Sequence, residues 1–162
     1  MPIKNYTTEI SEERTIGEIT GLLVAKGARQ ITIKYDEAGR AEGVSFYLLI
    51  EGMPIPFRLP CNFDGVFRYM LRQYKDRSAR WKFEQNPESK NQARRIAWRI
   101  IKDWVAAQMA LIEAEQASMP QIFLPYCTIN ISGDTAESVT MFDRFMEQVT
   151  KQKALPPQQE SL

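Results

Sequence analysis

The segment VSFYLLIEGMPIPFRLP, residues 44–60, decides the fold of this chain. Residues 44–50 are almost wholly apolar, a pattern typical of a strand buried at the centre of a sheet. Glu51 and Gly52 then predict a tight hairpin turn. In residues 54–60 apolar side chains alternate with prolines and an arginine. Because proline cannot donate a hydrogen bond to a neighbouring strand, this second strand is predicted at a sheet edge.

The residues before this segment add a strand and a helix. Residues 31–35 alternate between apolar and polar side chains, so residues 31–59 together predict an antiparallel β-meander. A helix over about residues 16–26 is predicted by Thr15, with Glu18 placed three positions later as in a capping box, and by Gly27 as its stop. Residues 4–10 alternate weakly and predict a further short strand.

Two helices are predicted after the meander. Asn62 caps the first, over about residues 63–75, and Asn86-Pro87 opens a long one that runs to about residue 117. The apolar stripe of the long helix has helical spacing and comprises Ala93, Ala97, Ile100, Trp104, Ala107 and Leu111. Trp104 is therefore expected to be deeply buried. The length of this helix also favours a homo-oligomer, because a small sheet does not cover it.

The C-terminal part is predicted as one or two short strands within residues 121–131, interrupted at Pro125, followed by a helix over about residues 136–152. That helix is expected to bury five apolar side chains: Val139, Met141, Phe142, Phe145 and Met146. The resulting fold class is α+β, an antiparallel β-meander packed against a long α-helix with additional N- and C-terminal helices. Residues 1–150 are predicted to form a single α+β domain, and residues 151–162 a disordered tail.

The composition argues against an enzyme. The chain has no histidine and only two cysteines, which removes the usual proton-transfer side chain and the Ser-His and Cys-His pairs. It contains no P-loop, GxGxxG or GxSxG motif, so no cofactor and no metal are expected. It also has no apolar run of about 20 residues and no signal-peptide pattern, which predicts a cytoplasmic protein that does not contact a membrane.

Positive charge is concentrated in one region. The chain has a net charge of only +1, yet residues 68–102 contain eleven Lys or Arg and three Asp or Glu. The remainder is therefore net acidic. This asymmetry favours a surface that faces a polyanion.

The basic residues fall into two helical rows and a connecting loop. Each row has the spacing i, i+4, i+7, which places its members on one helix face. The rows are Arg68, Arg72, Lys75 and Arg95, Arg99, Lys102; the loop supplies Arg77, Arg80 and Lys82. Two tryptophans, Trp81 and Trp98, lie among them and off the apolar stripe, which favours an accessible position, although a buried position is commoner for tryptophan. If the helices pair, the rows form a basic ridge suited to a nucleic-acid backbone, DNA or RNA. Trp98 and Trp81 could stack on an unpaired base or anchor a protein partner.

Two other interpretations of the same residues remain open. The polar face of an ordinary amphipathic helix is also charged, so the basic rows are compatible with a simple solvated surface. The protein could instead bind a protein, as an inhibitor of a host defence or nucleic-acid-processing complex, with the basic face on an acidic patch. A structural subunit that oligomerises through the long helix is the third possibility.

Several segments resemble one known group of proteins. They are KNYTTEI at residues 4–10, ERTIGEI at 13–19, PFRLP at 56–60, and ARRIAWRIIKDWVAAQMALIEAEQA followed by MPQIFLPY within residues 93–126. The pattern resembles a small protein family of phages and prophages of Gram-positive bacteria, over residues 4–126. The resemblance implies a viral context in the cytoplasm of a host cell, where accessories of DNA replication and inhibitors of host defence are both common. It implies no particular activity and assigns no residue a role.

Overall fold

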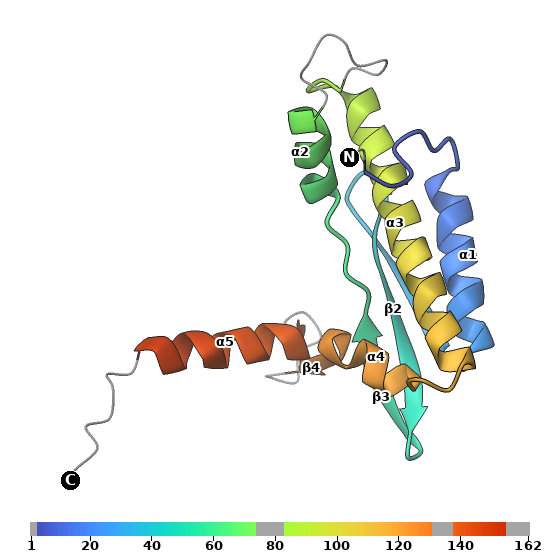
Figure 1. Cartoon of the computed structure of the whole chain (residues 1–162), viewed down its shortest axis with the longest axis vertical. Helices are drawn as coiled ribbons and strands as arrows, with labels where there is room; N and C mark the ends of the chain where they lie inside the picture. Colours follow the sequence, from blue (N-terminus) through green and yellow to red (C-terminus); the bar gives the residue numbers. More distant parts are fainter. Residues whose placement is uncertain (1–2, 74–82, 131–137, 155–162) are drawn as a thin grey trace.

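The computed structural model describes residues 3–73, 83–130 and 138–154 (Figure 1). The elements in chain order are α1 (Glu12–Ala25), β1 (Arg29–Tyr35), β2 (Ala41–Ile50), β3 (Met53–Arg58), α2 (Phe63–Gln73), α3 (Pro87–Glu113), α4 (Met119–Phe123), the 3-10 helix η1 (Leu124–Tyr126), β4 (Thr128–Asn130), β5 (Ser138–Thr140) and α5 (Met141–Ala154). Within these residues, no helix is both long and apolar enough to cross a membrane.

The β-meander is confirmed. The sheet order is β1-β2-β3 with both pairs antiparallel, so the apolar strand β2 is central and the proline-rich strand β3 lies at its edge. Ile50 pairs with Met53 across a two-residue turn. Glu51 and Gly52 both have positive φ, 50° and 77°, which matches the type I′ turn of a two-residue hairpin.

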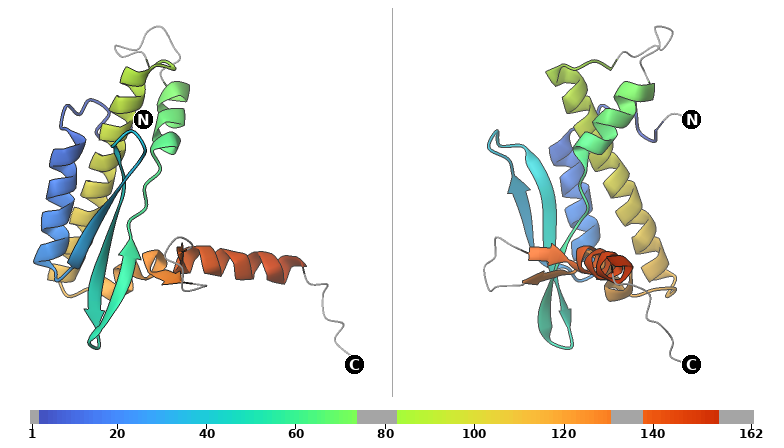
Figure 2. Two further views of the ribbon diagram at one scale, coloured as in Figure 1. Left: turned by 180° about the vertical axis from the view of Figure 1, so that it is seen from behind. Right: turned by 90° about the vertical axis from the view of Figure 1, so that its left-hand side faces the viewer.

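The α+β class is also confirmed, with helices on one face of the three-stranded sheet (Figure 2). α1 and α3 lie side by side against this face, and α2 packs against α3. The core lies between the two layers, and its fully buried large side chains include Ile19, Leu23, Val44, Phe46, Phe57, Trp98, Val105 and Phe123. The α+β arrangement therefore follows from two amphipathic helices that cover one apolar sheet face.

The start of α1 differs from the prediction. Its N-cap is Ser11, whose hydroxyl accepts a hydrogen bond from the Arg14 N–H, and not Thr15. Thr15 is buried, and its hydroxyl donates to the Ser11 carbonyl inside the first turn. The predicted stop is confirmed: Gly27 has φ of 96°, and Ala28 donates back to the carbonyl of Leu23 as in a Schellman motif.

The long helix is confirmed, but it faces the core with a different side. α3 begins at the predicted cap, where Asn86 accepts from the Ser89 N–H at 2.8 Å, and it ends at Glu113. Its buried face contains Trp98, Ile101, Val105 and Met109. Of the predicted stripe, Ala93 and Ala97 are buried, but Trp104 is only partly buried and Leu111 is 38% exposed, so the prediction that Trp104 is deeply buried is wrong. Apolar side chains cover a wide arc of α3, and the helical period alone does not select the side that faces the sheet.

Two segments near the ends of the fold also depart from the predictions. Residues 4–10 form no strand, because Gln92 on α3 donates its side-chain amide to the carbonyls of Tyr6 and Thr8 and holds the segment irregular. Residues 121–126 are helical, since Ser118 and Gln121 form a capping box that starts α4 and η1 follows it; β4 supplies one of the short strands predicted here. The capping box outweighs the strand pattern of the following residues.

The C-terminal helix projects from the body (Figures 1 and 2), and its large apolar side chains are exposed. β4 and β5 form a separate two-stranded sheet, and α5 follows directly. The prediction that this helix buries its apolar face is wrong, since Phe142, Phe145 and Met146 are 54%, 60% and 44% exposed. The elements that α5 contacts most are η1 and β5 at its base. Residues 151–154, predicted as tail, are helical, and residues 155–162 lie outside the described residues.

Candidate functional site

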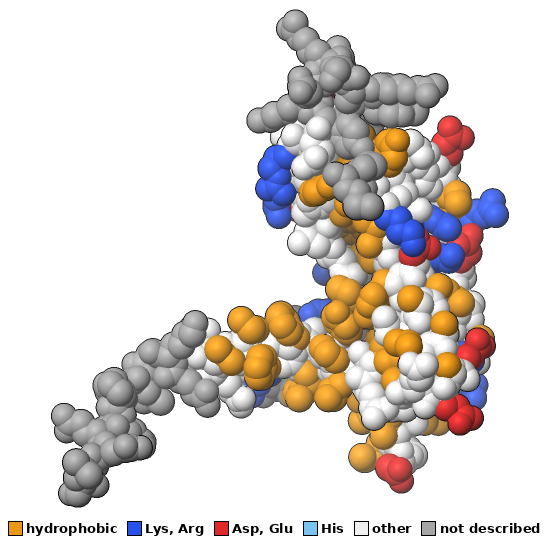
Figure 3. Space-filling view, in the orientation of Figure 1, with side chains coloured by type: hydrophobic (Ala, Val, Ile, Leu, Met, Phe, Trp, Pro, Cys, Tyr) orange, Lys and Arg blue, Asp and Glu red, His pale blue; other side chains and the backbone are white. Residues whose placement is uncertain are grey.

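The structure separates the two rows of the predicted basic ridge. Arg68 and Arg72 on α2 are exposed, and the ion pairs among the described residues involve neither of them. On α3, Arg95 donates to Gln92 at 3.1 Å and is only partly exposed. Figure 3 shows the Lys and Arg side chains in separate groups, one over α2 and another mixed with Asp and Glu side chains.

The rest of the α3 row is paired with acidic residues. Arg99 donates to Glu18 of α1 at 2.7 Å, and its side chain is only 12% exposed. This hydrogen bond lowers the pKa of Glu18, so the carboxylate and the guanidinium neutralise each other at neutral pH. Lys102 lies 3.6 Å from Asp103. The prediction that Arg99 is free on a common basic face is therefore wrong, because α1 packs its acidic residues against this side of α3.

Trp98 is part of the core and not of the surface. It is fully buried, and its indole N–H donates to Glu12 at 3.1 Å. The prediction that Trp98 is accessible for stacking is wrong, because the carboxylate on α1 satisfies the one polar group of the ring and lets it enter the core. Lys75, Arg77, Arg80, Trp81 and Lys82 lie outside the described residues, so their predicted role stays a prediction.

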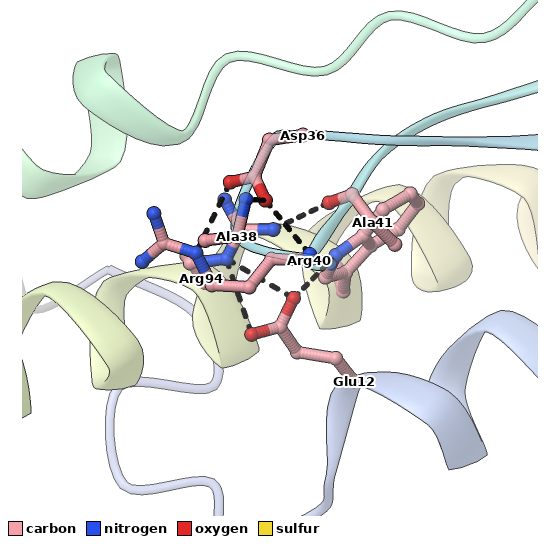
Figure 4. Close-up of polar contacts among 7 residues, drawn as sticks. Glu12, Asp36, Ala38, Arg40, Ala41 and Arg94 are labelled. Carbon is pink, nitrogen blue, oxygen red and sulfur yellow. Dashed lines mark hydrogen bonds and ion pairs between the residues drawn. The ribbon is translucent and has the colours of Figure 1, made fainter.

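Glu12 also binds Arg94, which joins four parts of the fold (Figure 4). The Arg94 Nε lies 3.2 Å from each Glu12 oxygen, and an Nη donates to the Ala41 carbonyl at the start of β2. The guanidinium also lies 4.2 Å from the centre of the Phe63 ring, at the start of α2. With a residue exposure of 8%, Arg94 is a structural cation. Sequence reasoning missed it because the two charged partners are far apart in the chain.

One wide groove is lined by cationic and acidic side chains in equal number. It has a volume of about 800 Å³ and lies between the first half of β2, residues 58–64 and the start of α5. Two of its cations are paired within the groove: Arg40 with Asp36 at 3.1 Å and Lys34 with Glu42 at 3.4 Å. Arg94 pairs instead with Glu12, and Arg58 acts on Asp143 through its charge.

The two cysteines do not provide a reactive thiol. Burial raises the pKa of Cys61 to about 12, so this thiol is protonated at neutral pH. Burial also raises the pKa of Cys127. Within the described residues, no three acidic or cysteine side chains gather as a metal site would require.

The most prominent surface feature is the apolar face of α5. We define it as Phe142, Phe145, Met146 and Val149, which have the spacing i, i+3, i+4 and i+7 of one helix face. Arg144, Glu147 and Lys151 lie on the opposite side, where Arg144 pairs with Glu147 at 3.4 Å. Figure 3 shows the hydrophobic surface of α5 continuing onto the adjoining body, where Leu124 of η1 is 54% exposed.

The base of α5 is held by specific hydrogen bonds. Asp143 accepts from the N–H and the hydroxyl of Thr140, at 3.0 and 2.7 Å, and its own N–H donates to the Thr140 hydroxyl at 3.2 Å. These bonds lower the pKa of Asp143 and keep it ionised. The Met141 N–H donates to the Cys127 carbonyl at 2.9 Å. α5 therefore leaves the body in a defined direction.

The fold and this surface together define a two-layer α+β protein with an exposed amphipathic helix. Comparison of the chain with models of known families, with curated proteins and with solved structures finds no match.

Proposed function

We propose that this protein acts by binding another protein chain, with the apolar face of α5 as the contact. The observation that carries the proposal is the exposure of Phe142, Phe145 and Met146 on a projecting helix, at 54%, 60% and 44%. Burying one such side chain completely is worth roughly 1.5–3 kcal/mol, so leaving several together in water is unfavourable. Contiguous exposed apolar patches are typical of interaction sites.

The form of the face supports one mode of recognition. Helices that bind in a groove present anchors at i, i+3, i+4 and i+7, which is the spacing of the α5 apolar face. The hydrogen-bonded base at Thr140 and Asp143 orients the helix before it binds, which lowers the entropic cost of association. The host complex expected from the resemblance to phage proteins is one possible partner, and a second copy of this chain is another.

Replacing Phe142 or Phe145 with Glu tests this proposal. Because both side chains are exposed, we expect each change to alter the free energy of unfolding of the monomer by no more than about 0.5 kcal/mol. We expect both changes to abolish two kinds of association: the capture of partners from extracts of the producing cell, and the self-association of the purified chain.

Val24 supplies the matched control, since it is 55% exposed on α1, on the other side of the body (Figure 1). Val24→Glu introduces the same charge and should retain every partner that the parent binds. If both α5 variants retain all the partners of the parent, its own copy included, then α5 is not the contact.

A second candidate function is nucleic-acid binding through α2. Arg68 and Arg72 stand at i and i+4, and both are exposed without an ion pair among the described residues. Two unpaired guanidinium groups on one helix face suit adjacent phosphates. This surface retains only the α2 part of the predicted ridge.

Replacing Arg68 and Arg72 together with Ala tests the second candidate. We expect the double variant to weaken binding to labelled oligonucleotides uniformly across sequences and to reduce the salt dependence by about one unit per lost phosphate contact. Fluorescence anisotropy with single- and double-stranded oligonucleotides at several salt concentrations measures both quantities. Arg144→Ala, which removes an exposed cation from α5, is the control and should bind as the parent does. Absence of binding at low salt, or full binding by the double variant, would reject this candidate.

A further inference from the structure

We infer that the chain covering the α5 apolar face is a second copy of this protein, with the two α5 helices packed antiparallel about a two-fold axis. The inference rests on the proposed protein-binding function and names the partner. A closed pair of this kind requires one surface that is complementary to itself.

The size of the surface is suited to such a pair. An aromatic side chain has roughly 150–250 Å² to bury, and Phe142 and Phe145 are each more than half exposed. Together with Met146, Met141 and Leu124, which are 44%, 36% and 54% exposed, each chain offers on the order of 400–500 Å² of apolar surface. Two such patches, if fully covered, bury roughly 800–1,000 Å², and the polar rim adds to this to reach the ~1,000 Å² that a specific interface needs.

The shape of the molecule favours the antiparallel direction. α5 begins at the body and extends away from it, and the body is much wider than the helix (Figures 1 and 2). Two parallel α5 helices would bring both wide bodies to the same end of the pair. Two antiparallel helices place the bodies at opposite ends, where they crowd each other less. The end of each helix then approaches the base of the other, where Met141 and Leu124 are exposed.

The side chains of the helix are compatible with their own copies. In an antiparallel pair centred between Phe145 and Met146, each Phe145 lies level with a Met146, and each Phe142 with a Val149. Large rings thus meet flexible or smaller side chains, and methionine sulfur packs well against aromatic rings. The charged residues Arg144, Glu147 and Lys151 lie about 150–170° from the centre of the apolar face, and Asp143 about 110° from it, at about 100° per residue. Lys153 lies about 30° from the centre by the same measure, but the antiparallel register places it level with Ser138 and not with its own copy.

Sedimentation velocity and light scattering on the full chain test the inference. We expect the parent to have twice the 18.7 kDa mass of one chain at about 10–100 µM. Phe145→Glu, at the centre of the contact, should give a monomer with unchanged circular dichroism and with the melting temperature that the parent has when it is diluted until it dissociates. Val24→Glu, the matched control, should remain a dimer.

Cysteine cross-linking tests the direction of the helices. In a background in which Cys61 and Cys127 are replaced with Ser, we expect Phe142→Cys chains mixed with Val149→Cys chains to form a mixed disulfide. Either chain alone should form little. The reverse pattern, with each variant cross-linking to itself, would overturn the antiparallel arrangement.

The failure of this inference is distinguishable from the failure of the proposed function. If the parent is a monomer at about 100 µM, and an apolar dye such as anilinonaphthalene sulfonate binds it but not Phe145→Glu, then the face is free and belongs to a different protein. The inference that a second copy covers the face is then wrong, and the proposed protein-binding function stands. If the parent is a monomer and Phe145→Glu sharply lowers its melting temperature, then the face packs on its own chain. The inferred dimer and the proposed protein-binding function are then both wrong.

Discussion

Replacing Trp98 with Ala is expected to destabilise the fold by about 3–5 kcal/mol, the cost of truncating a large aromatic side chain in a core. Trp98 is fully buried within the core, and its loss would leave a cavity and remove the indole hydrogen bond to Glu12. Urea unfolding followed by circular dichroism measures the change in the free energy of unfolding.

Trp104 is the matched control for this prediction. It lies six residues further along the same helix and contacts Phe123 and Tyr126, but it is only partly buried. Trp104→Ala should therefore cost clearly less than Trp98→Ala. If Trp104→Ala is the more damaging of the two, the assignment of the buried face of α3 is wrong.

Replacing Arg94 with Met is also expected to cost about 3–5 kcal/mol, because it removes one partner of a largely buried ion pair. The change leaves the Glu12 carboxylate, whose side chain is 18% exposed, without its cation. It also leaves the Ala41 carbonyl without its donor from Arg94. Chemical unfolding of the variant and the parent gives the difference in the free energy of unfolding.

A double-mutant cycle separates the ion pair from the packing of the arginine stem. Glu12→Gln should be less harmful in the Arg94→Met background than in the parent, because no cation then depends on the carboxylate. Arg68→Met, at an exposed position, should change the free energy of unfolding by no more than about 0.5 kcal/mol. Additive effects of Glu12→Gln and Arg94→Met would contradict a direct interaction between these residues.

Local features of the chain could be predicted from the sequence because they depend on near neighbours. The hairpin at Glu51-Gly52 needs two adjacent residues that tolerate positive φ, and the start of α3 needs only Asn86 and Pro87. The apolar run of residues 44–50 must lie at the centre of a sheet because neither of its faces is clearly polar. The stop of α1 at Gly27 also depends on near neighbours and was predicted correctly. The start of α1 was misplaced because Thr15 offers a second plausible cap.

The candidate sites depended on contacts between distant segments. Arg99 has the spacing of a surface row, and Trp98 lies off the predicted apolar stripe. In the structure Arg99 donates to Glu18 and Trp98 donates to Glu12, so both side chains lie in the α1–α3 interface. Charge and helical period describe one helix at a time. They do not say which neutralising residue another helix will bring.

The apolar face of α5 shows the same division. The sequence by itself determined that Phe142, Phe145, Met146 and Val149 share one side of a helix, since this follows from a period of 3.6 residues. Only the tertiary structure decided that this side is uncovered. The Thr140–Asp143 cap and the bond from Met141 to Cys127 direct α5 away from the core, whose sheet face is already filled by α1 and α3. An amphipathic pattern requires that the apolar face be covered, but the geometry of the whole chain determines whether its own residues or another chain's cover it.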